Sequence, residues 1–180
     1  ELSHPHLLVV VGLATDGVRN YGLLMEYMPR SLARVLARAQ GSPETANKLK
    51  TVWLSIVADL ISALIYLHSQ GVGHYAIHPK NILFDGAISL KLADYGRSQE
   101  THLRQLEEQQ QNAEKTVGGA DEPRQLYLAP EVLRMESFTP AADVWSVGCV
   151  IARLGSLVRL YGETNVSTHI IMMRVSSGEL

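Results

Sequence analysis

This chain of 180 residues has a single cysteine, Cys149. One cysteine excludes an internal disulfide and a zinc site built on cysteines. Charge of one sign is not in excess either, since the net charge is −2, which gives no electrostatic reason to expect nucleic-acid or membrane-surface binding. No apolar run approaches the roughly 20 residues that span a bilayer, and the N-terminus lacks a signal-peptide pattern. We therefore expect a globular protein of a reducing compartment, the cytoplasm.

The residues that are present suit one domain or part of one, because 46% are apolar and 19% are charged. The chain opens without Met at Glu1 and ends on no recognisable boundary, so we expect a piece of a longer chain. Apolar runs of β-branched and aliphatic residues predict a hairpin around the Asp16-Gly17 turn, with a buried first strand. Its expected strands are His6–Leu13 and Tyr21–Tyr27.

Helical periodicity follows the hairpin, after Pro29 breaks the second strand. Ser31 suits the N-cap of a first helix, and GSPET suits a loop after it. Gly71 suits the C-cap of the next, longer helix. The chain then turns to two short strands and returns to helix, apart from a Gln- and Glu-rich stretch from Arg97 to Glu122. We expect helices at Ser31–Gln40, Lys48–Gln70, Ala141–Leu160 and over the HIIMMRV run, and strands at Asn81–Phe84 and Ser89–Ala93.

The stretch GHYAIHPKNILF, from Gly73 to Phe84, has the make-up of an active-site loop without a carboxylate. Before it come LLMEYMPRSL and a long predicted helix that ends in YLHSQGVGH. After it come KLADYG, YLAPEVL and ADVWSVGCVIARL. In this order and spacing the motifs resemble the protein-kinase family. The resemblance implies an α+β fold that is mostly the helical C-lobe, with residues 1–28 as the end of the N-lobe and 29–180 as an incomplete C-lobe. The Gly-rich loop, the strand-three Lys and the helix-C Glu would precede Glu1.

The resemblance also implies a site for ATP and Mg²⁺. Asn81 of the catalytic loop and Asp94 of the D-Y-G motif would hold the metal through oxygen atoms. Met25 would be the gatekeeper, Glu26 to Met28 the hinge that meets the adenine edge, and Leu83 the apolar floor under the ring. Packing or turn roles remain open for Asn81, Leu83 and Asp94. Tyr95 takes the place of the usual Phe, as in leucine-rich-repeat kinases, and its hydroxyl would need a partner if buried.

Three positions depart from the kinase pattern around the transferred phosphate. Ala76 takes the place of the general-base Asp, His78 that of the catalytic-loop Lys, and Arg124 that of a Thr before the A-P-E. A positioned base contributes on the order of 10²–10⁴ in rate, so phosphate transfer should be impaired. His78 is a doubtful substitute base. Tyr75 also replaces the Arg that pairs with an activation-loop phosphate.

Our leading hypothesis is therefore a pseudokinase, a binding module that holds ATP with Mg²⁺ and acts through protein partners. Two alternatives stay open: an active atypical protein serine/threonine kinase, and a structural scaffold that binds no nucleotide. The stretch from Arg97 to Glu122 is either a solvated segment or a docking element. The sequence identifies neither a substrate nor a protein partner. It gives no reason to expect nucleic-acid binding or a membrane segment.

Overall fold

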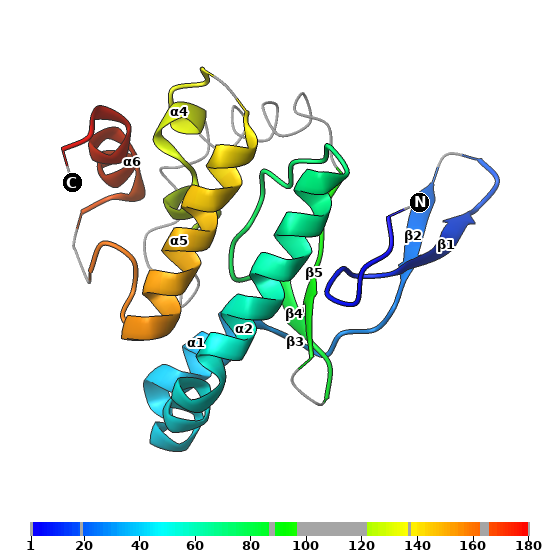
Figure 1. Cartoon of the computed structure of the whole chain (residues 1–180), viewed down its shortest axis with the longest axis horizontal. Helices are drawn as coiled ribbons and strands as arrows, with labels where there is room; N and C mark the ends of the chain where they lie inside the picture. The colour runs from blue at the N-terminus through cyan, green and yellow to red at the C-terminus, as the bar shows by residue number, and fades with distance from the viewer. Residues whose placement is uncertain are drawn as a thin grey trace.

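The computed structural model describes residues 2–18, 20–86, 89–96, 122–136, 138–162 and 166–179. The expected α+β class is confirmed, with two small sheets and a body of helices (Figure 1). The strands are β1 (Val10–Thr15), β2 (Tyr21–Met25), β3 (Arg30–Ser31), β4 (Ile82–Phe84) and β5 (Leu90–Leu92). The helices are α1 (Leu32–Gly41), α2 (Pro43–Ser69), α4 (Pro130–Leu133), α5 (Pro140–Ser156) and α6 (Thr168–Ser177), with a 3₁₀ turn η2 (Arg124–Tyr127) before α4.

The first hairpin stands apart from the helical body, and β1 pairs with β2 in antiparallel register (Figure 1). The expected turn is present, because Asp16 accepts the backbone N–H groups of Val18 and Asn20. The expectation of a buried first strand over His6–Leu13 is wrong. The strand runs from Val10 to Thr15, and side chains such as Val11, 70% exposed, meet no covering layer within the described residues.

Side-chain caps set where the first two helices begin. The Ser31 hydroxyl accepts the Arg34 backbone N–H at 3.4 Å, so α1 begins where the sequence predicts. Helix α2 begins at Pro43 rather than at Lys48, because Ser42 caps it and a proline fits the first helical position. The expected loop over GSPET is therefore mostly helix. Gly71 follows the end of α2 with φ of 71°, the left-handed conformation expected of a glycine there.

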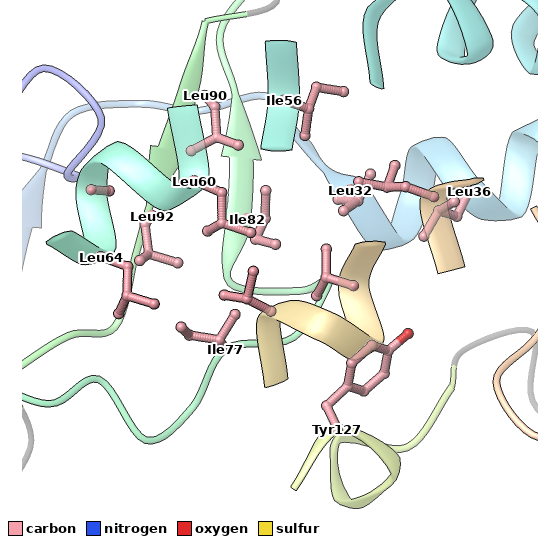
Figure 2. Close-up of a cluster of buried hydrophobic side chains, with 14 of the residues drawn as sticks. Leu32, Leu36, Ile56, Leu60, Leu64, Ile77, Ile82, Leu90, Leu92 and Tyr127 are labelled. Carbon is pink, nitrogen blue, oxygen red and sulfur yellow. The ribbon is translucent and has the colours of Figure 1, made fainter. Parts of the chain in front are cut away.

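The main core lies between α2, α5 and the sheet of β3, β4 and β5 (Figures 1 and 2). Helices α2 and α5 lie side by side, while α1 packs across the first turns of α2. Helix α5 ends at Ser156, four residues before the predicted end, since Leu157 takes a left-handed conformation with φ of 58°. Fully buried members of this core are Leu32, Leu60, Ala63, Leu67, Ile82, Leu90, Leu92 and Val150.

Helix α2 bears on the expectation that no apolar segment is long enough to span a bilayer. By length and composition alone this helix could cross a bilayer, which the apolar runs in the sequence do not predict. Those two criteria are weak grounds, because a core helix satisfies them too. One face of α2 lies in the core through residues such as Leu60 and Leu67, while Leu54, Ile61 and Ile65 are exposed on another.

Two predictions fall wholly or partly outside the described residues. Of the Gln- and Glu-rich segment from Arg97 to Glu122, the structure describes Glu122 alone. The turn that joins β4 to β5 is described at Asp85 and Gly86, where Asp85 accepts the Ser89 N–H at 2.9 Å, and not at the next two positions.

The core assignment predicts unequal costs for two leucines on one helix. Replacing fully buried Leu60 by Ala should lower the free energy of unfolding by about 3 kcal/mol, since it removes apolar contacts and leaves a cavity. Leu54→Ala on the same helix is the matched control, because that side chain is 64% exposed and its loss should cost less than about 1 kcal/mol. Urea denaturation measures both, and equal costs would contradict this packing.

Candidate functional site

The segment from Gly73 to Asn81 connects α2 to β4 and is anchored by a carboxylate from α5. Asp143 is fully buried and accepts the backbone N–H groups of His74 at 2.8 Å and Tyr75 at 2.6 Å. Its Oδ2 also lies 2.9 Å from Nε2 of His68, in the last turn of α2. Burying an ion is costly unless donors surround it, and here three donors do so. Asp143 thereby ties the loop and two helices together.

His74 connects the anchored loop to the end of the strand that precedes the D-Y-G motif. Its Nδ1 accepts the Ala76 N–H at 3.2 Å, so Nε2 carries the proton and donates to the Ala93 carbonyl at 3.0 Å. Complete burial lowers the pKa of this imidazole, which is therefore neutral near pH 7. His74 serves as a structural bridge between the loop and the end of β5.

Tyr75 packs where the kinase pattern places a charged arginine. Its backbone has φ of 57°, a conformation that costs a non-glycine residue roughly 1 kcal/mol, and Asp143 holds its N–H. Its ring lies so close to Gly73 that a Cβ there would clash at 2.1 Å, and it meets Phe138 edge to face with ring centres 5.5 Å apart. The side chain at this position works by packing.

Ala76, at the position of the expected base, contributes through its backbone. Its methyl group is buried and offers neither a proton acceptor nor a hydrogen bond. Its carbonyl accepts the Asn81 side-chain amide, with Nδ2 3.0 Å away. That bond commits the amide nitrogen, and the amide oxygen of Asn81 is the atom suited to a hard cation.

His78 is a neutral and largely buried imidazole. Burial, followed by the positive charge of Arg124, lowers the pKa of His78 to about 3. Its Nδ1 accepts the Lys80 backbone N–H at 3.3 Å, which places the ring proton on Nε2. Since Arg124 and Asp94 both act on this pKa, the structure brings two of the departing positions, 78 and 124, near the D-Y-G motif.

Asp94 and Asn81 belong to segments joined by a backbone hydrogen bond. The Ala93 N–H donates to the Asn81 carbonyl at 2.9 Å, so the residue before Asp94 is fixed to the loop. Asp94 is half-buried and has φ of 69°. Among the described residues no three His, Cys, Asp or Glu side chains gather to hold a metal. A cation at Asn81 and Asp94 would thus need further oxygen ligands, which phosphates supply.

The Tyr95 hydroxyl has the partner that the sequence requires of it. It donates to the Leu8 carbonyl at 2.6 Å, and partial burial raises the pKa of Tyr95. The bond joins the D-Y-G motif to the segment that leads into β1.

The predicted adenine-binding residues lie at the end of β2 and on β4. Met25 ends β2 and is half exposed, while the Glu26 N–H donates to the Val9 carbonyl at 3.1 Å. The Glu26 carboxylate accepts the Val9 N–H at 2.7 Å and pairs with Lys91 at 3.2 Å. Within the described part of the chain, the Glu26 carbonyl and the Met28 N–H take part in no hydrogen bond, so both can meet a flat ligand edge. Half-buried Leu83 keeps one side exposed on β4.

A buried ion pair that the sequence pattern does not predict holds the segment before the A-P-E. Glu122 pairs with Arg153 of α5 at 3.0 Å, and also accepts the Tyr127 hydroxyl and the Leu160 N–H. Arg153 is almost completely buried. No local pattern marks this pair, because its two residues are far apart in the sequence. Its effect is to fix η2, and with it Arg124, against the helical body.

Comparisons with known proteins find a family and several relatives whose sequences are similar to this chain. The sequence pattern of the protein kinase domain matches residues 1–177. Mitogen-activated protein kinase kinase kinase 3 of Arabidopsis thaliana is 30% identical over 157 residues, which cover 87% of this chain and 22% of that protein. MAP3K epsilon protein kinase 1 of Brassica napus is 34% identical, over 89% of this chain and 11% of its own length. Human 3-phosphoinositide-dependent protein kinase 1 is 28% identical, with 86% and 25% covered.

The anchoring role of Asp143 predicts a large loss of stability on a small change. Asp143→Asn places an amide NH₂ against backbone N–H donors, so the free energy of unfolding should fall by about 3 kcal/mol. Asp59→Asn is the control, since its pairing with His6 at 3.4 Å is partly exposed and should be worth less than about 1 kcal/mol. Chemical denaturation at pH 7.5 compares the two. Similar losses would show that Asp143 is not the anchor.

The low pKa of His78 predicts that acid destabilises the fold. Between pH 6.5 and about 3 the unfolded chain binds a proton that folded His78 does not, so stability falls as the pH falls. His78→Asn keeps an acceptor for the Lys80 N–H and removes the imidazole. It should flatten the slope of unfolding free energy against pH by up to about 1.4 kcal/mol per pH unit between pH 6 and 4. At pH 8 the slopes should coincide, and an unchanged slope at low pH would refute the prediction.

Proposed function

Because this chain belongs to the protein kinase domain family, we propose that it is a pseudokinase, which binds ATP with Mg²⁺ and acts through protein contacts. The observation that carries the proposal is the chemistry of two loop positions: a methyl group at Ala76 and a neutral, buried imidazole at His78. The chain spans a quarter or less of the relatives described above, so the activity, substrates and partners of the whole protein belong to this proposal.

The loop lacks a group that could take the proton of an attacking hydroxyl. Ala76 has no acceptor in its side chain, and a general base works best with a pKa near the working pH. His78, with a pKa of about 3, is a poor base and carries no charge to stabilise a transferring phosphate. Its Nδ1 lone pair is already engaged by the Lys80 N–H. Both functions of the pattern, proton removal and phosphate contact, are thus weakened together.

The groups for holding a nucleotide remain. The Asn81 amide oxygen and the Asp94 carboxylate are hard donors that fit Mg²⁺, which would neutralise phosphate charge when bound. Backbone groups of Glu26 and Met28, with Met25 and Leu83 as apolar neighbours, would orient an adenine ring. We assign residues 1–28 to the end of an N-lobe and 29–180 to a C-lobe, with the site at their junction. We place the protein in the cytoplasm.

The proposal predicts nucleotide binding without transfer. With the full chain, ATP and Mg²⁺ at a hundred times the dissociation constant should stabilise the fold by about 2.7 kcal/mol in a thermal-shift titration. Asp94→Ala should remove the Mg²⁺-dependent part of that stabilisation, and Asp59→Asn should leave it unchanged. Radiolabelled ATP should give no more labelled protein product than the Asp94→Ala variant gives.

Two outcomes would overturn this proposal. Turnover that Asp94→Ala abolishes would show an active kinase, and loss of that turnover in His78→Ala would make His78 its base. No stabilisation by ATP, with or without Mg²⁺, would show a scaffold that binds no nucleotide.

A further inference from the structure

We propose that a basic groove between α1, the first turns of α2 and the start of the β4–β5 turn is a docking site for an acidic, amphipathic peptide segment of a partner protein. The groove encloses about 710 Å³ and is lined from Pro29 to Asp85 by residues of these elements. It lies at the end of the body where α1 crosses α2 (Figure 1). We define it by an apolar floor and a rim of arginines, and the proposal does not depend on whether the chain transfers phosphate.

The floor of the basic groove is aliphatic and aromatic. Leu49, Ile56 and Phe84 are buried at its base, and Val35 and Val52 are half-buried along its sides. These side chains come from α1, α2 and β4, and α1 packs on both of the other elements, which holds the floor in place. A rigid apolar floor of this kind accepts large apolar side chains of a ligand, which gain free energy by leaving water.

The rim carries four cations, and three of them, the arginines, form no ion pair within the described part of the chain. Arg34 and Arg38 lie one helical turn apart on α1, and neither guanidinium forms a hydrogen bond or an ion pair with a described residue. The charge of Arg38 acts on Glu44 of the same groove at longer range, where it adds to the effect of Lys48 in lowering the pKa of that carboxyl. Lys48 also lines the groove, but it is paired with Glu44 at 2.7 Å. Arg30 of β3 also lines the groove, and its guanidinium donates to the Gly86 carbonyl at 3.4 Å. Arg34 and Arg38 are therefore the lining cations whose side chains form neither a hydrogen bond nor an ion pair with a described residue.

The local charge is opposite to that of the whole chain. The lining includes four cationic residues and two acidic ones, an excess of two positive charges, while the chain carries a net −2. An excess of cations above an apolar floor complements a segment that alternates carboxylates with large apolar side chains. A single-stranded nucleic acid would instead favour exposed aromatic side chains for stacking, and Phe84, the aromatic residue that lines the groove, is buried in its floor. Each guanidinium can also bind a carboxylate in a bidentate manner, so Asp and Glu fit as the acidic groups.

A selection with random peptides tests this proposal while the partner is unidentified. A library of 12-residue peptides displayed on phage is selected on the full chain, with counter-selection on the Arg34→Ala, Arg38→Ala double variant. Peptides retained only by the unmodified chain should contain at least two Asp or Glu and two large apolar residues. Measured by fluorescence polarisation, their affinity should fall about tenfold or more in the double variant and should weaken as salt rises.

Matched measurements separate the groove from general charge effects. Lys50→Ala on α2 removes an exposed cation outside the groove and should leave peptide affinity within about twofold. The double variant should keep the thermal midpoint and the ATP response of the unmodified chain. The proposal fails if no retained peptide depends on Arg34 and Arg38, if such peptides show no acidic bias, or if a labelled 12-nucleotide RNA is the probe that depends on the two arginines.

Discussion

The structure of the site depends on one buried carboxylate. Asp143 projects from α5 to the loop after α2, and it satisfies two adjacent backbone N–H groups that would otherwise be buried without partners. Because one of these belongs to Tyr75, the same contact offsets the cost of that residue's left-handed backbone. His68 supplies a third contact from the end of α2. A single side chain thus fixes the loop relative to both long helices, and His74 extends the order to β5.

This arrangement explains why the loop keeps its shape without a catalytic carboxylate. Holding the loop uses the backbone of Ala76, whose N–H meets His74 and whose carbonyl meets Asn81. The side chain at position 76 takes part in neither bond. The absence of a carboxylate there therefore changes the chemistry of the loop and not its framework. His78 likewise helps to shape the turn through its bond to the Lys80 N–H. At position 76 the framework and the reactivity therefore reside in different atoms, and one can be lost without the other. At His78 the imidazole ring itself is part of the framework.

Periodicity and caps were sufficient to predict α1, most of α2, α6 and the β4–β5 pairing, because local forces dominate there. The order of the motifs was sufficient to predict the loop and its neighbours. Other features depend on residues far apart in the sequence. The Glu122–Arg153 pair, the low pKa of His78 and the rim position of Arg34 and Arg38 follow from which surfaces meet. The exposed hairpin illustrates the same point, since an apolar strand pattern cannot show whether a covering layer is present.

Strand β4 connects the basic groove with the proposed nucleotide site. Asn81 precedes this strand, Leu83 lies in its middle, and Phe84 at its end lines the groove. Leu83 is paired on both sides, with Ser31 of β3 and Lys91 of β5, so a displacement at Phe84 would move its neighbours as well. Changes to the floor of the groove would therefore perturb the nucleotide site for purely mechanical reasons. Arg34 and Arg38 lie on α1 outside this sheet, whereas Arg30 lies in β3 opposite Phe84. Arg34 and Arg38 therefore report on docking separately from nucleotide binding.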